Sequence, residues 1–149
     1  MKLITKLGCA AVAAAAFWTA GVSAQGYFLD GSIIDYRQQI MRAQDANAAA
    51  IGMILTGTVP NENMLTHFEA LLLSNRQARD IFEMEIEGGN AKPEIWENWD
   101  DFAGKLDTAE ENLKLAIEEI KANGPGAAGE VAIAALACKD CHDVYKVTE

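Results

Sequence analysis

The sequence predicts an all-α protein folded as an antiparallel four-helix bundle, and three observations carry this prediction. Half of the 149 residues are hydrophobic and only 7% are aromatic, and this alanine-rich composition favours helices over sheets. Four long stretches repeat their apolar residues every three or four positions, whereas no stretch alternates with period two. The connections between these stretches are short, which favours antiparallel packing of neighbouring helices.

The N-terminus has the pattern of a secretory signal peptide. Lys2 and Lys6 form a positive start, an apolar alanine-rich run follows, and small residues lead up to Ala24. We therefore expect a signal peptide over 1–24, cleaved after Ala24, and one bundle domain over 25–149. The apolar run is short for a membrane span. The mature protein is thus expected to be exported, to the periplasm in a bacterium, and to have no membrane partner.

The first two helices are predicted from their caps and breaks. The first covers 32–55, with Ser32 as its expected N-cap and Pro60 in the break that follows. The second covers 62–86, with Asn61 as its N-cap, and the Gly-Gly-Asn run after it interrupts the periodicity. Both stretches place an apolar face every three to four residues, so each is expected to bury one side against the bundle.

The third helix has the clearest pattern in the chain and covers 99–122. Its apolar residues keep heptad spacing over three repeats, with acids and lysines on the opposite face. A short turn containing Trp96 precedes it. Pro125, between two glycines, ends it. The last helix is predicted over 127–146 as one continuous element and carries the motif described next.

The motif Cys138-Lys139-Asp140-Cys141-His142 points to a cofactor. C-x-x-C-H is the attachment signature of c-type haem. On a helix, positions 138, 141 and 142 lie on one face about one turn apart. The two sulfurs can then bond the vinyl carbons along one haem edge, and His142 can direct its imidazole at the iron as proximal ligand. The sequence therefore predicts one covalent haem c, with its iron, on the last helix.

Other interpretations of the two cysteines stay open at this point. A thioredoxin-like dithiol would need a strand before the motif, and none is predicted. A zinc site would need a fourth ligand, and the one other histidine, His67, is expected to face solvent. A disulfide across i and i+3 of a helix would be strained. A haem-free helical interaction module is a further alternative. The export signal, together with the motif, favours haem.

The net charge of the chain argues against some classes of binding partner. The formal net charge of −10 argues against nucleic acid and anionic membrane surfaces. The acidic runs 83–87 and 118–119 are expected to be solvated helix faces, with the orientation of a basic redox partner as the alternative. No nucleophile–base pair, phosphate loop or functional carboxylate pair is evident, so we expect no enzymatic activity.

The placement of the motif on the last helix of a bundle resembles class II c-type cytochromes, the cytochrome c prime family. The resemblance covers essentially the whole mature chain. It rests on four segments: Tyr36-Arg37-Gln38 followed by Met41, Ala48-Ala49-Ala50-Ile51-Gly52, the loop 89–96 with its Pro-Glu-Ile-Trp run, and Cys138–Tyr145. The resemblance implies a periplasmic protein, often a homodimer, that transfers electrons or binds small gases such as nitric oxide or carbon monoxide.

The resemblance also implies haem contacts. Arg37 and Gln38 would approach the haem propionates, because an arginine fork pairs well with a carboxylate; for Arg37 the alternative is a solvated helix charge. Asn90 would meet the haem edge, or is simply a turn residue. Lys146 departs from the family, in which many members have arginine close to the iron on the proximal side, and a lysine ammonium lacks the fork that a bidentate proximal contact needs.

Met41 matches the family's distal position, one turn after Arg37. In low-spin relatives a first-helix methionine gives its thioether to the iron, which raises the potential and suits electron transfer with a redox partner protein. In five-coordinate members a distal side chain only shields the iron, and small gases bind there. Methionine is also a common core residue. The sequence favours an electron-transfer cytochrome with Met41 as a potential sixth ligand, and gas binding is the alternative.

Overall fold

A computed structural model describes residues 30–147 of the chain. The predicted signal peptide and the start of the predicted domain lie outside these described residues. Seven elements follow in order: α1 (Asp30–Leu55), α2 (Met64–Phe82), α3 (Glu94–Glu97), α4 (Trp99–Asn123), the 3₁₀ turn η1 (Pro125–Ala128), α5 (Gly129–Ala135) and α6 (Cys138–Tyr145). Within the described part no strand forms, and the only β-type pairs are isolated bridges at the 88–91 loop.

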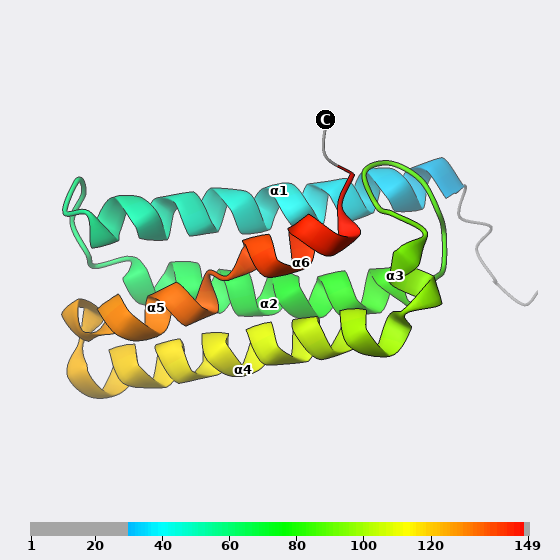
Figure 1. Ribbon diagram of the computed structural model, residues 1–149. Helices are drawn as coiled ribbons and strands as arrows, with labels where there is room; N and C mark the ends of the chain where they lie inside the picture. The colour runs from blue at the N-terminus through cyan, green and yellow to red at the C-terminus, as the bar shows by residue number, and fades with distance from the viewer. Residues whose placement is uncertain (1–29, 148–149) are drawn as a thin grey trace, which may run out of the picture.

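The predicted four-helix bundle is confirmed. Helices α1, α2 and α4 lie side by side and run in alternating directions, and α5 and α6 together take the fourth position (Figure 1). The motif Cys138 to His142 lies on α6, the last helix, as predicted. The short connections explain the antiparallel order, because each helix must turn back directly onto its neighbour.

The prediction of one continuous last helix over 127–146 is wrong. The helix stops after Ala135 and restarts at Cys138, because Leu136 and Ala137 leave helical geometry. Local propensity does not explain this, since leucine and alanine are good helix formers. Tertiary packing does: α5 buries its alanines against α4, whereas α6 is displaced from the line of α5 (Figure 1). The break lets α6 pack on a different part of the bundle.

The second helix is shorter than predicted. It begins at Met64 with Asn63, not Asn61, at its N-cap, and it ends at Phe82 instead of 86. The chain turns at Glu85, which has a φ of 43°, before it reaches the glycines. The predicted bounds of the first and third helices agree with the structure to within two residues. The early end of α2 lengthens the loop to α3, which becomes part of the site.

The core is divided into two clusters. One lies at the α5 end of the bundle, where Phe68 and Ile51 are completely buried among residues of α1, α2, α4 and α5. The other lies at the α3 end and is aromatic: the Phe102 ring packs edge-on against Phe82 and Tyr145, with ring centroids 5.0 and 5.2 Å away. The heptad of α4 runs through both clusters, and the cavity described next has walls from each.

Candidate functional site

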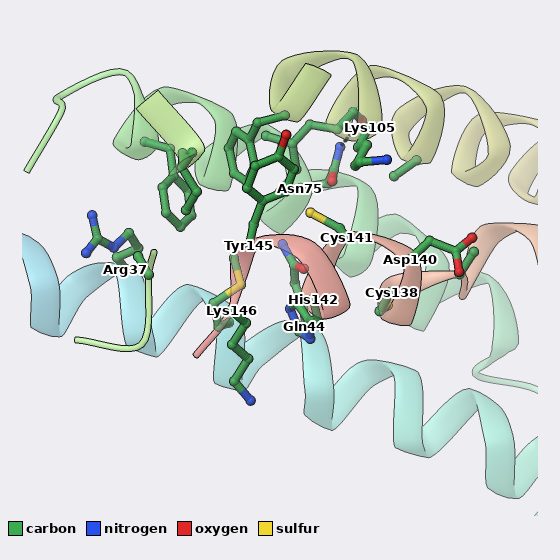
Figure 2. Close-up of a pocket in the computed structure, with 18 of the residues that line it drawn as sticks. Arg37, Gln44, Asn75, Lys105, Cys138, Asp140, Cys141, His142, Tyr145 and Lys146 are labelled. Atoms are coloured by element: carbon green, nitrogen blue, oxygen red, sulfur yellow. Dashed lines mark hydrogen bonds between the residues drawn. The ribbon is translucent and has the colours of Figure 1, made fainter. Parts of the chain in front are cut away.

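A cavity of about 1110 Å³ opens between α1, α4, α6 and the loop from α2 to α3 (Figure 2). Cavities that hold cofactors or drug-sized ligands commonly have volumes of about 300–1,000 Å³. The residues that the sequence places near the haem all line this cavity: Arg37, Gln38, Met41, Asn90, Cys138, Cys141, His142 and Lys146. The fold therefore brings together residues that lie more than one hundred positions apart in the sequence.

The motif side chains share one side of α6. Cys138 and His142 are exposed and Cys141 is half-buried, and both cysteines are free thiols. Partial desolvation by the surrounding protein atoms raises the pKa of the Cys141 thiol to about 11 and also raises the pKa of Cys138, so both sulfurs are protonated at neutral pH. Partial desolvation of the imidazole, aided by the positive charge of Lys146, lowers the pKa of His142. A neutral imidazole is the form that ligates iron.

The described residues bear on three of the alternatives to haem. The two thiols are not joined in a disulfide. Over residues 30–147, no three His, Cys, Asp or Glu side chains gather as a metal site would require. The same part of the chain has no strand before the motif, which a thioredoxin-like dithiol would need. Attachment of a cofactor remains the interpretation that uses both cysteines and the histidine together.

The walls of the cavity fit a porphyrin. The amide nitrogen Nε2 of Gln44 is buried without a hydrogen-bond partner, and Gln44 lines the cavity (Figure 2). A buried donor is costly to leave unpaired, so it points to a group that fills this space. Leu106 and Ala109 keep the heptad spacing of α4 but are only half-buried, because they face the cavity instead of a neighbouring helix. Apolar walls with a few polar groups suit a flat macrocycle with polar edges.

Arg37 is not the solvated charge of the alternative interpretation. Its side chain is buried, with 3% exposed, and its guanidinium donates to the carbonyls of Ile86 at 2.7 Å and Gly88 at 2.8 Å. The guanidinium carbon lies 4.8 Å from the ring centroid of Phe82 and 5.6 Å from that of Trp96. Burial lowers the pKa of Arg37 below its usual value. Its partners in the structure are thus the loop and the aromatic cluster.

Gln38, Asn90 and Lys146 meet the cavity at the same loop. Gln38 packs on Gly89: a Cβ at Gly89 would lie 3.0 Å from the Gln38 side-chain nitrogen. Asn90 is exposed and uses its carbonyl to accept a 2.9 Å hydrogen bond from the Val147 amide. Lys146 is exposed and pairs through its backbone with the loop. The roles of these three side chains toward haem remain predictions.

Tyr145 and Gln44 are two residues of the cavity wall to which the sequence assigned no role. Tyr145 is 4% exposed and its hydroxyl donates to Asp101 Oδ2 at 2.6 Å, and burial together with this contact raises the pKa of Tyr145 to about 12. Both could have been found by helical spacing, because Tyr145 lies three positions after His142 and Gln44 three positions after Met41.

The remaining histidine and methionines lie elsewhere. His67 is half-buried, contrary to the expectation of solvent exposure, because its Nδ1 hydrogen-bonds Asn47 Oδ1 on α1 at 2.9 Å. Met64 is in the apolar core, and Met53 and Met84 are exposed. Among residues 30–147, Met41 is therefore the one methionine on the cavity wall.

A family model described as "Cytochrome C'" matches residues 32–146, which is most of the chain and includes the whole cavity wall. The chain belongs to the cytochrome c′ family. Members of this family are haem proteins, which agrees with a cavity whose walls fit a porphyrin.

No curated protein sequence matches the chain. No helix within the described residues has the length and apolarity needed to span a bilayer.

Solved cytochromes c′ share the fold. One is a ferrous arginine-to-lysine variant from Alcaligenes xylosoxidans with bound nitric oxide, at a TM-score of 0.74 and 23% identity over 80% of this chain and 97% of that one. Another is a carbon monoxide-bound leucine-to-glycine variant from the same organism, at 0.74 and 22% over 80% and 98%. A third, a cytochrome c′, gives 0.74 and 22% over 81% and 99%. At these identities the likeness concerns the fold.

Proposed function

We propose that the mature protein is a periplasmic monohaem c-type cytochrome that binds a small gas such as nitric oxide or carbon monoxide. The observation that carries the proposal is that Cys138, Cys141 and His142 of α6 all line one cavity, which residues of α1 also line. The cysteine sulfurs would hold haem c through thioether bonds, and His142 would be the proximal ligand. When bound, this group would supply an iron that can take a small gas as a ligand.

Met41 is proposed to shield the iron. It lies on α1, lines the cavity, and packs, partly buried, against the aromatic cluster that contains Phe82 and Phe102. A thioether held by apolar packing can exclude water and limit access without bonding to the iron. Gas-bound forms of two structural neighbours support this proposal over the electron-transfer function that the sequence favoured.

Electron transfer with Met41 as sixth ligand is the second candidate. The observation in its favour is that Met41 is on the cavity wall, whereas the other methionines of residues 30–147 are not. A six-coordinate iron would keep the same ligands in both oxidation states, which suits exchange of electrons with a partner protein. Export through the 1–24 signal peptide and the lack of enzymatic activity are parts of both proposals.

Absorption spectroscopy separates the two candidates. The pyridine haemochrome assay should give one haem c per chain. The ferrous protein should then show a high-spin spectrum that changes to that of a low-spin complex under carbon monoxide. Sharp low-spin ferrous bands that carbon monoxide leaves unchanged would reject gas binding and support ligation by Met41. A Met41→Leu variant sharpens the result, because a shielding residue tolerates this change whereas a ligand does not.

A further inference from the structure

The C-terminal end of α6 is bound to the loop between α2 and α3. The residues that follow α6 are extended, and they pair with a short extended part of the loop. The pairing consists of an antiparallel bridge between Ala91 and Lys146 and two main-chain hydrogen bonds, Lys92 N–H to the Tyr145 carbonyl at 3.0 Å and Val147 N–H to the Asn90 carbonyl at 2.9 Å. These contacts begin three residues after His142. The loop therefore fixes the end of the helical turn that carries the histidine.

Lys92 adds a side-chain contact to this pairing. Its ammonium Nζ donates to the carbonyl of Val144 at 2.9 Å. The last carbonyls of a helix have no partner within the helix, so a cation placed there satisfies one of them and interacts well with the helix dipole. Lys92 thus holds the last turn of α6 through its main chain and its side chain together.

The same loop is held against α1 by Arg37. The two hydrogen bonds from the Arg37 guanidinium go to the carbonyls of Ile86 and Gly88, and the guanidinium lies over two aromatic rings that flank the loop. Gly88 allows the close approach: it has a φ of +125°, and a Cβ there would lie 2.7 Å from the Ile34 side chain. The Trp96 indole closes the base of the loop by donating to the Phe82 carbonyl at 2.8 Å.

We propose that Arg37 is a positioning residue for the haem-bearing helix. It anchors the 86–92 segment to α1, and that segment in turn holds the end of α6 and so sets where His142 stands in the cavity. This is a different role from a propionate contact, because it acts through backbone carbonyls. This proposal rests on the proposed function only in taking haem as the group next to His142. The contacts that connect α1 to α6 do not depend on which group binds there.

Two variants of the full holoprotein test this connection at its two ends. Arg37→Met keeps the length of the side chain but removes both donors, and Lys92→Met removes the Nζ contact while leaving the main-chain pairing. Each should speed hydrogen exchange of the Lys146 and Val147 amides, by about tenfold for Arg37→Met. Each should also shift the iron–histidine stretching band of the ferrous protein, which reports the position of His142.

The double variant decides between a connected and a separate role. Once the segment is released from α1, the Lys92 contact adds less, so the effects should not be additive. Arg76→Met is the matched control: Arg76 is exposed and pairs with Glu110 on α4, and the variant should change neither readout.

Unchanged exchange at Lys146 and Val147 in either single variant overturns the proposal, as does strict additivity in the double variant. If Arg37→Met does not accumulate, Lys92→Met still gives a decisive result, because its contact is at the surface. If the chain carries no haem, the proposed function fails, whereas the exchange measurement still reports on the connection between α1 and α6.

Discussion

The two ends of the bundle are stabilised in different ways. The α5 end is closed by apolar side chains from four helices, and its central residue, Phe68, is fully buried. The α6 end contains a buried arginine, a tyrosine–aspartate hydrogen bond and a large cavity. A continuous apolar core gains stability from area alone. The cavity end lacks that packing, and its specific hydrogen bonds, together with the haem proposed to fill the cavity, would provide stability in its place.

The largest expected effect comes from removing the attachment chemistry. A Cys138→Ala, Cys141→Ala double variant should carry no covalent haem, measured by pyridine haemochrome after extraction with acidified organic solvent. Relative to the wild type, hydrogen exchange should then accelerate more in α6 and the 86–92 segment than around Phe68, because the cavity lies at the α6 end. Equal acceleration at both ends would contradict the difference between them.

Shortening a core side chain at the α5 end should lower the stability of the protein without changing the haem site. Phe68→Ala should lower the free energy of unfolding by about 3–5 kcal/mol, because it leaves a cavity in a packed core. The absorption spectrum of the folded variant should stay that of the wild type, since Phe68 does not line the haem cavity. Leu73→Ala on the same helix is the control: its side chain is 59% exposed, and a change within about 0.5 kcal/mol is expected. Denaturant titration measures both.

The tyrosine anchor of α6 should give a smaller effect that depends on pH. The pKa of Tyr145 is raised to about 12 in the folded protein from a usual value of 10.0, so the unfolded chain loses the phenolic proton first. Stability from this group is complete below pH 10 and is lost as pH rises toward 12. Tyr145→Phe should lower stability by about 1 kcal/mol at neutral pH and lack this alkaline decline. Denaturation curves for both proteins across this range would reveal an unchanged decline if another group were responsible.

The smallest effect is expected from Gln44. Its amide nitrogen is a buried donor on the cavity wall, so it should polarise a gas bound there. Gln44→Leu should therefore raise the carbon–oxygen stretching frequency of the ferrous carbon monoxide complex, because a nearby positive dipole is removed. Gln39→Leu, at an exposed position of the same helix, should leave the frequency as in the wild type. Identical spectra for all three proteins would place the Gln44 amide away from the bound gas.

The two ends of the bundle also differ in how well the sequence predicts which side chains are buried in the core. At the α5 end the three-to-four spacing of apolar residues predicts burial well, because Phe68 of α2 and Leu113 of α4 keep this spacing and are in the core. At the α6 end the same spacing places Leu106 and Ala109 inside, but they face the cavity. Periodicity reports which side of a helix avoids water, and it does not tell a neighbouring helix from a cofactor.

The spacing of residues along the sequence predicts neither the partners of Arg37 nor the break in the last helix. An arginine among apolar residues can find hydrogen-bond acceptors in several places, and only the folded chain shows that the carbonyls of Ile86 and Gly88 are its partners. The break at Leu136 has no sign in local propensity either, because both residues of the break favour helix. It results from the different surfaces on which α5 and α6 pack.

The sequence by itself determined the all-α bundle, the family, and the three residues that would attach haem. These depend on local periodicity and on chemistry carried within five consecutive positions, Cys138 to His142. Only the tertiary structure decided where the last helix breaks, that Gln44 and Tyr145 join the site, and that Arg37 binds the loop next to α6. Those outcomes depend on contacts between segments far apart in the sequence, such as the pairing of Ala91 with Lys146, which form only when the bundle closes.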